Sequence, residues 1–205
     1  MVSVCFYFQL HQPLRLRNYS VFEIGRHNSY FDERKNEAII KKVTHKCYLP
    51  TNKLILDLIS KTDGRFKAAY SMTGIVLEQL EKFAPEVIDS FKELVDTGCV
   101  EILDETYYHT LSYLYSNEEF KEQVEIHHKK IRQLFNFKPK VFRNTELVYN
   151  NEIAKTIEDM GYKGILAEGA DHILGWRSPN FVYRPKDSKK ISLLLKNYRL
   201  SDDVA

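Results

Sequence analysis

The residues with the clearest chemical potential lie between positions 142 and 150, where Glu146 follows a short apolar segment expected to be a strand. Arg143 and the amides of Asn144 and Asn150 accompany it, and such groups can hold a carboxylate ionised and aim it. The rim of a parallel sheet, just past a strand end, is where α/β enzymes keep nucleophiles and bases. Glu146 is therefore the first candidate for a catalytic residue, although it could instead cap the following helix or pair with Arg143.

Strands and helices alternate along the chain on both sides of this segment. Apolar runs predict strands at residues 2–8, 66–70, 100–103, 140–142, 163–166 and 191–195. Apolar stripes with helical spacing predict helices near residues 54–59, 76–83, 85–95, 116–135 and 153–160. The stretch between the first strand and the first helix is expected to be irregular. This alternation predicts an α/β fold with a mostly parallel sheet, open or closed into a barrel.

Polar side chains follow most of the expected strands at the point where each strand ends. They are His11, Ser71, Asp104, Glu105, Asn144, Glu146, Glu168, Asp171 and His172, and Glu101 lies inside the third strand. Because the carboxyl ends of parallel strands meet at one edge of a sheet or barrel, the pattern predicts a site at that edge.

Several short motifs resemble those of one enzyme family. They are His11-Gln12-Pro13 and residues 98–102, 105–109, 142–150, 168–172 and 175–179. In this order, nearly from end to end, they resemble the motifs of glycoside hydrolase family 57, the retaining α-amylase-like enzymes. The resemblance implies a (β/α)7-type barrel of the glycoside hydrolase and deacetylase kind. It also implies hydrolysis of α-1,4-glucans such as starch, glycogen or maltooligosaccharides.

The same resemblance assigns roles to individual residues. Glu146 corresponds to the catalytic nucleophile, while His11, Glu101, His109 and Trp176 would bind or orient the glucose units of the α-glucan substrate. A retaining glycosidase needs two carboxyl groups about 5–5.5 Å apart, one to attack the anomeric carbon and one to protonate the leaving oxygen. No cofactor and no metal ion is therefore expected.

Two departures from the family pattern stand out. Gln9 occupies the position, two residues before His11, where the family often has a histidine. The family's fourth motif, which bears the aspartate general acid, is expected beyond Ala205. We therefore expect residues 1–205 to form the N-terminal portion of a single barrel catalytic domain. Such a portion would be incomplete and inactive alone, with the remainder of the same polypeptide as its partner.

Each binding residue also has a simpler structural interpretation. His11 could be a loop histidine bonded to the backbone, and Glu101 could belong to a satisfied buried pair. Trp176 could pack in the core, although the Gly/Ser/Pro-rich loop around it favours exposure and sugar stacking. His127 and His128 look like a metal pair, but neighbours on a helix point about 100° apart. They are expected to be a histidine at the core edge and a solvated neighbour.

The composition narrows the class of protein. A chain of 205 residues can bury a full core as one domain. Its 30 basic and 28 acidic residues are mixed along the whole length, so neither nucleic-acid binding nor a membrane role is expected. Three isolated cysteines, Cys5, Cys47 and Cys99, indicate a reducing cytoplasm rather than a disulfide frame or a zinc site.

Three other functions stay open on the sequence. A 4-α-glucanotransferase of the same family would share all of the motifs. A metal-dependent polysaccharide deacetylase would share the barrel type. It needs an Asp-Asp pair after the first strand and two histidines four residues apart, whereas Gln9 and His11 stand after the strand here. A non-catalytic carbohydrate-binding module would bind sugar without turnover.

Overall fold

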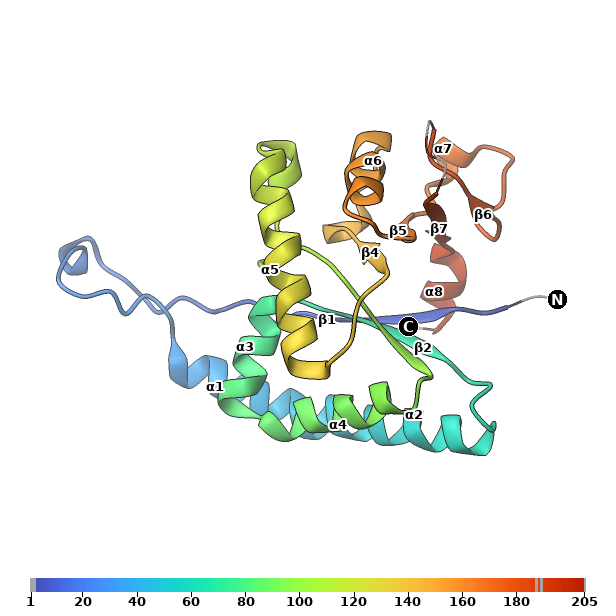
Figure 1. Ribbon diagram of the computed structural model, residues 1–205. Coiled ribbons are helices and arrows are strands. Elements are labelled where there is room, and N and C mark those ends of the chain that lie inside the picture. Colours follow the sequence, from blue (N-terminus) through green and yellow to red (C-terminus); the bar gives the residue numbers. More distant parts are fainter. Residues whose placement is uncertain (1–2, 187, 189, 205) are drawn as a thin grey trace. The chain divides into compact units, whose positions relative to one another are not determined.

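The computed structural model describes residues 3–186, 188 and 190–204, and the chain divides into two compact units. Unit 1 is Met1–Glu101 and unit 2 is Ile102–Ala205. Each unit combines strands with helices, as Figure 1 shows with the chain coloured from blue to red. Within the described residues, no helix has the length and apolar character needed to cross a membrane.

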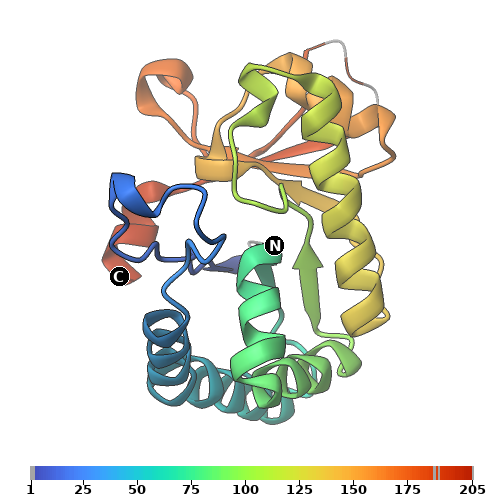
Figure 2. The same cartoon turned by 90° about the vertical axis from the view of Figure 1, so that its left-hand side faces the viewer.

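Unit 1 is built on strands connected by helices. Its elements are β1 (Phe6–Leu10), α1 (Glu33–Val43), α2 (Leu49–Lys61), β2 (Ala68–Met72), α3 (Gly74–Phe83), α4 (Pro85–Asp96) and the start of β3 (Val100–Leu103). The sheet order is β1-β2-β3, and β1 runs parallel to β2. Figure 2 shows the four helices grouped together, with α4 packed against α2 and α3.

The core of unit 1 follows the apolar stripes of these helices. Ile55 and Ile59 of α2 are buried, whereas Leu54 is exposed because it lies off the packed face. The ring of Tyr70 on β2 meets the ring of Phe91 on α4 edge to face, with centroids 5.1 Å apart. The helix predicted for residues 54–59 is therefore confirmed, but its buried face is narrower than the apolar stripe in the sequence.

A long helical segment replaces the irregular stretch expected before residue 54. Helix α1 begins after Asp32, whose side chain accepts a hydrogen bond from the backbone N–H of Lys35. A π-helical turn, Thr44–Tyr48, joins α1 to α2, and Leu49 N–H bonds to Thr44 O across it. Pro50 follows directly, and a wider turn accommodates a residue that has no backbone N–H to donate. Pro50 and the many charged residues explain why apolar periodicity alone does not predict this helical segment.

Unit 2 carries the segment that contains Glu146. Its elements are the end of β3, α5 (Asn117–Phe135), β4 (Val141–Arg143), α6 (Asn151–Asp159), β5 (Gly164–Glu168), α7 (Asp171–Leu174), β6 (Val182–Tyr183), β7 (Ser192–Lys196) and α8 (Tyr198–Val204). The sheet order is β4-β5-β7-β6; β4, β5 and β7 are parallel, and β6 is antiparallel to β7. Figure 1 shows α5 and α6 next to β4 and β5.

One face of this sheet forms the core of unit 2. Phe142, Ile165 and Leu193 lie in register on neighbouring strands, and all three are buried. Phe120 of α5 and Ile157 of α6 belong to the same apolar cluster. Ser116 caps α5, which lies within the helix predicted for residues 116–135, by accepting a hydrogen bond from the backbone N–H of Glu119. The core thus fixes β4, whose C-terminal end leads to Glu146.

Five of the six predicted strands end one or two residues further toward the C-terminus than their apolar runs suggest. The first strand was expected to give way to a loop at Gln9, but β1 continues through Leu10, with Gln9 opposite Ser71 in the ladder. Val2, at the start of the expected strand, lies outside the described residues. A ladder depends on backbone groups, so a polar side chain does not end it. Only the strand at residues 100–103 has the expected bounds.

Gly169, just after β5, allows a close backbone approach that gives a testable prediction. A Cβ atom at this position would lie 2.3 Å from the backbone oxygen of Lys196 and 2.9 Å from Cβ of Pro179. Gly169→Ala is therefore expected to destabilise the fold by about 1–3 kcal/mol in urea unfolding. Gly164→Ala is the matched control, since its nearest neighbours are methyl groups of Val141 at 3.3 Å, which can shift. Equal losses for both variants would contradict this assignment.

Candidate active site

Glu146 lies in a tight turn with an unusual backbone. Both Glu146, with φ 53°, and Leu147, with φ 55°, adopt the left-handed conformation that L-residues rarely take. The Glu146 side chain is 69% exposed, while Leu147 is buried. Two consecutive residues in this conformation cost free energy, and such strain concentrates at functional sites. The turn therefore presents one carboxylate to solvent and anchors itself with one apolar side chain.

Hydrogen bonds of Asn144 and Thr145 hold this turn. Asn144 donates from Nδ2 to the backbone oxygen of Val148 at 2.9 Å, and Leu147 N–H donates to Asn144 O at 3.0 Å. The Thr145 hydroxyl is 2.9 Å from the hydroxyl of Thr106, and both threonines are buried. The sequence indicated Asn144 as a donor that could keep Glu146 ionised. In the structure its amide nitrogen shapes the turn.

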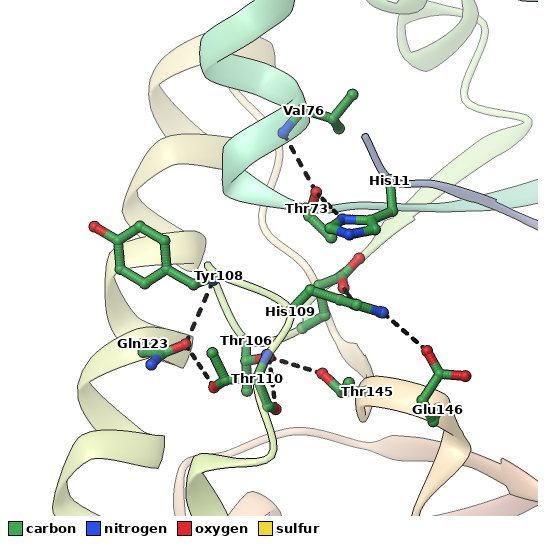
Figure 3. Close-up of polar contacts among 11 residues, drawn as sticks. His11, Thr73, Val76, Thr106, Tyr108, His109, Thr110, Gln123, Thr145 and Glu146 are labelled. Atoms are coloured by element: carbon green, nitrogen blue, oxygen red, sulfur yellow. Dashed lines mark hydrogen bonds and ion pairs between the residues drawn. The ribbon is translucent and has the colours of Figure 1, made fainter. Parts of the chain in front are cut away.

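His109 is the side chain that contacts Glu146 in unit 2. Its Nε2 lies 3.0 Å from Glu146 Oε1 (Figure 3). Its Nδ1 lies 3.3 Å from Oε2 of Glu105. The Glu105 side chain is fully buried and the His109 side chain is 12% exposed. The structure thus brings together two residues predicted from the sequence, Glu146 and His109. It adds Glu105, whose part the sequence did not reveal.

The loop that carries His109 is tied down on both sides. His109 itself is left-handed, with φ 55°, and its N–H donates to Thr106 O. Thr110 donates its backbone N–H to the Thr106 hydroxyl and its own hydroxyl to Gln123 on α5, each at 3.0 Å, as Figure 3 shows. The same Gln123 oxygen accepts from Tyr108 N–H. His109 is therefore aimed by a fixed loop.

The surroundings of His109 favour its charged form. The hydrogen bond that His109 donates to Glu105 raises the pKa of the imidazole, burial opposes this, and the hydrogen bond to Glu146 adds to the rise. The positive charge of Arg143 works in the opposite direction, but the net pKa is raised. The contacts of protonated His109 with Glu105 and Glu146 therefore stabilise the folded state. This contribution is complete below the ordinary imidazole pKa of about 6.5. That contribution is lost as the pH rises through the higher folded pKa.

A second polar cluster is centred on Asp104, the residue before Glu105. Its carboxylate is fully buried, and Oδ1 accepts from Nδ1 of His127 at 2.7 Å. Its Oδ2 accepts from Nδ1 of His128 at 2.7 Å and from the Tyr162 hydroxyl at 2.6 Å. The backbone of Asp104 also bridges to β4, since Asp104 N–H donates to Val141 O and Arg143 N–H donates to Asp104 O. The cluster therefore ties α5 and β4 to the segment that leads to Glu105.

This cluster corrects the expectation for the two adjacent histidines. His127 is fully buried rather than at the core edge, and His128 is bonded rather than merely solvated. The 100° separation on the helix forbids convergence on one point, but each ring meets a different oxygen of Asp104. Among the residues that the structure describes, no group of three or more His, Cys, Asp or Glu side chains is arranged to hold a metal ion.

The other predicted binding residues are placed as follows. In unit 1, His11 lies just after β1, and its Nδ1 is 3.1 Å from the hydroxyl of Thr73, which caps α3 and accepts from Val76 N–H (Figure 3). Glu101 is half-buried inside β3. In unit 2, Trp176 is 94% exposed in the loop after α7, so it is not a core residue. Exposure is what a sugar-stacking role requires.

Solved structures of similar shape define the class of fold. 4-alpha-glucanotransferase from Thermococcus litoralis matches with a TM-score of 0.74 at 18% identity, covering 98% of this chain and 28% of that one. A GH57-type branching enzyme from Pyrococcus horikoshii matches with a TM-score of 0.66 at 17% identity, covering 95% of this chain and 47% of that one. The expected α/β fold with parallel sheets, close to that of the family's barrel enzymes, is thus confirmed.

The family model described as "Glycosyl hydrolase family 57" matches residues 5–205, and the chain belongs to that family. A relative named "Putative alpha-amylase" from Methanocaldococcus jannaschii is 50% identical over 98% of this chain. The match covers 43% of that relative, so this chain spans less than half of its length. The resemblance drawn from the motifs is confirmed at the level of the family.

Proposed function

We propose that this chain carries the nucleophile of a retaining glycoside hydrolase that acts on α-1,4-glucans. The observation that carries the proposal is the geometry at Glu146, an exposed carboxylate fixed by a left-handed turn, with His109 Nε2 3.0 Å away. Family membership and the name of the Methanocaldococcus jannaschii relative support the substrate class. His11, Glu101 and Trp176 are proposed to contact the glucose units.

The proposed reaction has two steps. A Glu146 oxygen attacks the anomeric carbon while the glycosidic C–O bond breaks, and a carboxylic acid protonates the leaving oxygen. Water then attacks the same carbon, the bond from that carbon to Glu146 breaks and releases the carboxylate, and the same acid residue, now a base, takes the water's proton. Two inversions at one carbon retain its configuration. We propose that the general acid is an aspartate supplied by sequence beyond Ala205.

The test of this proposal is covalent trapping in the full-length protein. A fluorinated α-glucosyl or α-maltosyl fluoride forms the glycosyl-enzyme quickly, and this intermediate then hydrolyses slowly. Mass spectrometry of a peptic digest should therefore find the label on Glu146. NMR of the first product from a maltooligosaccharide should show the α-anomer. A label on another residue, or a first product in the β-configuration, would overturn the assignment.

Exhaustive chelation is expected to leave the activity of the full-length protein unchanged. The proposed chemistry relies on two carboxyl groups, and the sequence offers no histidine or cysteine set with convincing metal-ligand spacing. Activity should be measured on a maltooligosaccharide before and after dialysis against EDTA, with a known metallohydrolase treated in parallel as the control. A loss that one specific ion restores would favour the deacetylase alternative.

Transfer of a glucan chain remains the second candidate within the same family. The observation behind it is the likeness to 4-alpha-glucanotransferase from Thermococcus litoralis, which extends over 98% of this chain. The two activities share the glycosyl-enzyme and differ in whether water or a sugar hydroxyl resolves it. Product chain lengths from pure maltotriose distinguish them, because only transfer gives products longer than the substrate.

A further inference from the structure

The residues behind Glu146 form a line that runs from the interior of unit 2 to its surface. The Glu105 side chain is fully buried, the His109 side chain is 12% exposed, and the Glu146 side chain is 69% exposed. The imidazole is placed between the two carboxylates, at 3.3 Å from Glu105 Oε2 and 3.0 Å from Glu146 Oε1. Only the outermost of these three groups is freely accessible to a polymer substrate.

Two carboxylates on opposite sides of one imidazole favour a particular protonation state. An ionised carboxylate only accepts hydrogen bonds, and a neutral imidazole has a single N–H. Both contacts are satisfied together when both ring nitrogens carry a proton, which gives the imidazolium cation. The raised pKa of His109 agrees with this geometry, although the nearby charge of Arg143 opposes it. Among the residues that the structure describes, Glu105 and Glu146 raise the pKa of this ring and the charge of Arg143 lowers it.

We propose that Glu105 and His109 are positioning residues for the nucleophile, with His109 as a cation that holds Glu146 Oε1 and directs Oε2 toward the anomeric carbon. This inference rests on the proposed function of Glu146. It gives His109 a different part from the substrate contact expected from the family motifs. Glu105 never meets the substrate and acts only through His109.

The pair contributes to both steps of the reaction. When Oε2 bonds to the anomeric carbon and the glycosidic bond breaks, Oε1 becomes the carbonyl oxygen of the ester and still accepts the His109 N–H. When water resolves the ester, negative charge returns to the carboxylate beside a cation, which makes it a better leaving group.

The experiment is a pH–rate profile of kcat/KM for the full-length protein on a 4-nitrophenyl α-maltooligoside. The nitrophenolate leaving group needs no protonation, so the profile reports the nucleophile and its neighbours rather than the general acid. His109→Gln keeps an N–H donor but removes the charge. In its profile the fall in activity on the basic side is expected to disappear, because in the wild type that fall reports the loss of the His109 proton.

Glu105→Gln tests the same inference from the buried side. His109 then loses the anion that holds its proton, so the pH at which activity falls on the basic side should decrease. NMR of histidine-labelled protein should show the His109 titration at lower pH than in the wild type. If Glu105→Gln fails to fold, His109→Gln and the wild-type titration carry the test. His45→Gln, an exposed histidine in unit 1, is the matched control and should leave the profile in place.

The outcomes separate this inference from the proposed function. A uniform loss of rate with both limbs unmoved, or a neutral His109 at pH 6 in the wild type, would overturn the positioning role. If Glu146 itself fails to take the fluoroglycoside label in the wild type, the proposed function fails. If Glu146 takes the label but the pH–rate profiles of both variants match the wild type, the proposed function stands and the positioning role of Glu105 and His109 is rejected.

Discussion

Replacing Glu146 by glutamine is expected to lower kcat of the full-length protein by on the order of a thousandfold or more. The amide has the size of the carboxylate but cannot attack an anomeric carbon. Because the Glu146 side chain is 69% exposed, the substitution should leave the unfolding midpoint and glucan binding nearly unchanged. The measurement is kcat on a maltooligosaccharide, with binding followed by calorimetry.

Two further variants sharpen this result. Glu122→Gln changes an exposed glutamate on α5 and should keep full activity. Glu146→Gly opens space for azide, which should restore turnover and form the β-glycosyl azide, since azide enters from the side that Glu146 occupied. If Glu146→Gln keeps more than about a tenth of wild-type kcat, which is ~1.4 kcal/mol of barrier, Glu146 is not the nucleophile.

Replacing Asp104 by alanine is expected to give the largest loss of stability in the chain. The buried carboxylate accepts hydrogen bonds from His127, His128 and Tyr162, and its removal breaks all three of these bonds. Breaking a buried, charge-assisted cluster in this way typically costs about 3–5 kcal/mol. Urea unfolding followed by far-UV circular dichroism measures the effect. The matched variant Tyr162→Phe removes one donor and should cost only about 1 kcal/mol.

The stability supplied by Asp104 should also depend on pH. Burial alone raises the pKa of the Asp104 carboxyl, but the hydrogen bonds from His127 and His128, the charge of His127 and the Tyr162 hydroxyl outweigh it. The folded pKa is therefore below the ordinary aspartate value of about 3.9. Its contribution is complete above that value and is lost as the pH falls through the folded pKa. The gap in unfolding free energy between wild type and Asp104→Asn should narrow below about pH 4; a constant gap would contradict this origin.

The sequence predicts the order of elements well because apolar periodicity reports which faces are buried. It predicts strand ends poorly, since Gln9 and Ser71 pair in a ladder that depends on backbone atoms. Helix α1 was not predicted, because charged residues dominate it and only Asn36 and Ile40 are buried. The packing of α1 against the rest of unit 1 is a tertiary property, which a local sequence pattern cannot reveal.

In the candidate site, too, some features were predicted from the sequence and others depend on tertiary structure. Glu146 was predicted from its place after a strand and from motif resemblance, and the structure adds its contact with His109. The part played by Glu105 was not predicted, because it depends on the left-handed backbone of His109, which only a folded loop specifies. Asp104 and His127 are 23 positions apart. The one available signal was a histidine within the apolar face of α5, which requires a buried polar partner.

The left-handed pair Glu146–Leu147 has a consequence for the entropy of the reaction. A glycine in either place would relieve the strain, but it would also let the turn sample many conformations. With two L-residues and the buried Leu147 side chain as an anchor, the carboxylate is already ordered before a glucan arrives. For the nucleophile proposed above, less binding energy would then be consumed in immobilising the backbone that carries the carboxylate. If Glu146 acts as proposed, the strain in the turn lowers folding stability and also lowers the entropic barrier to attack.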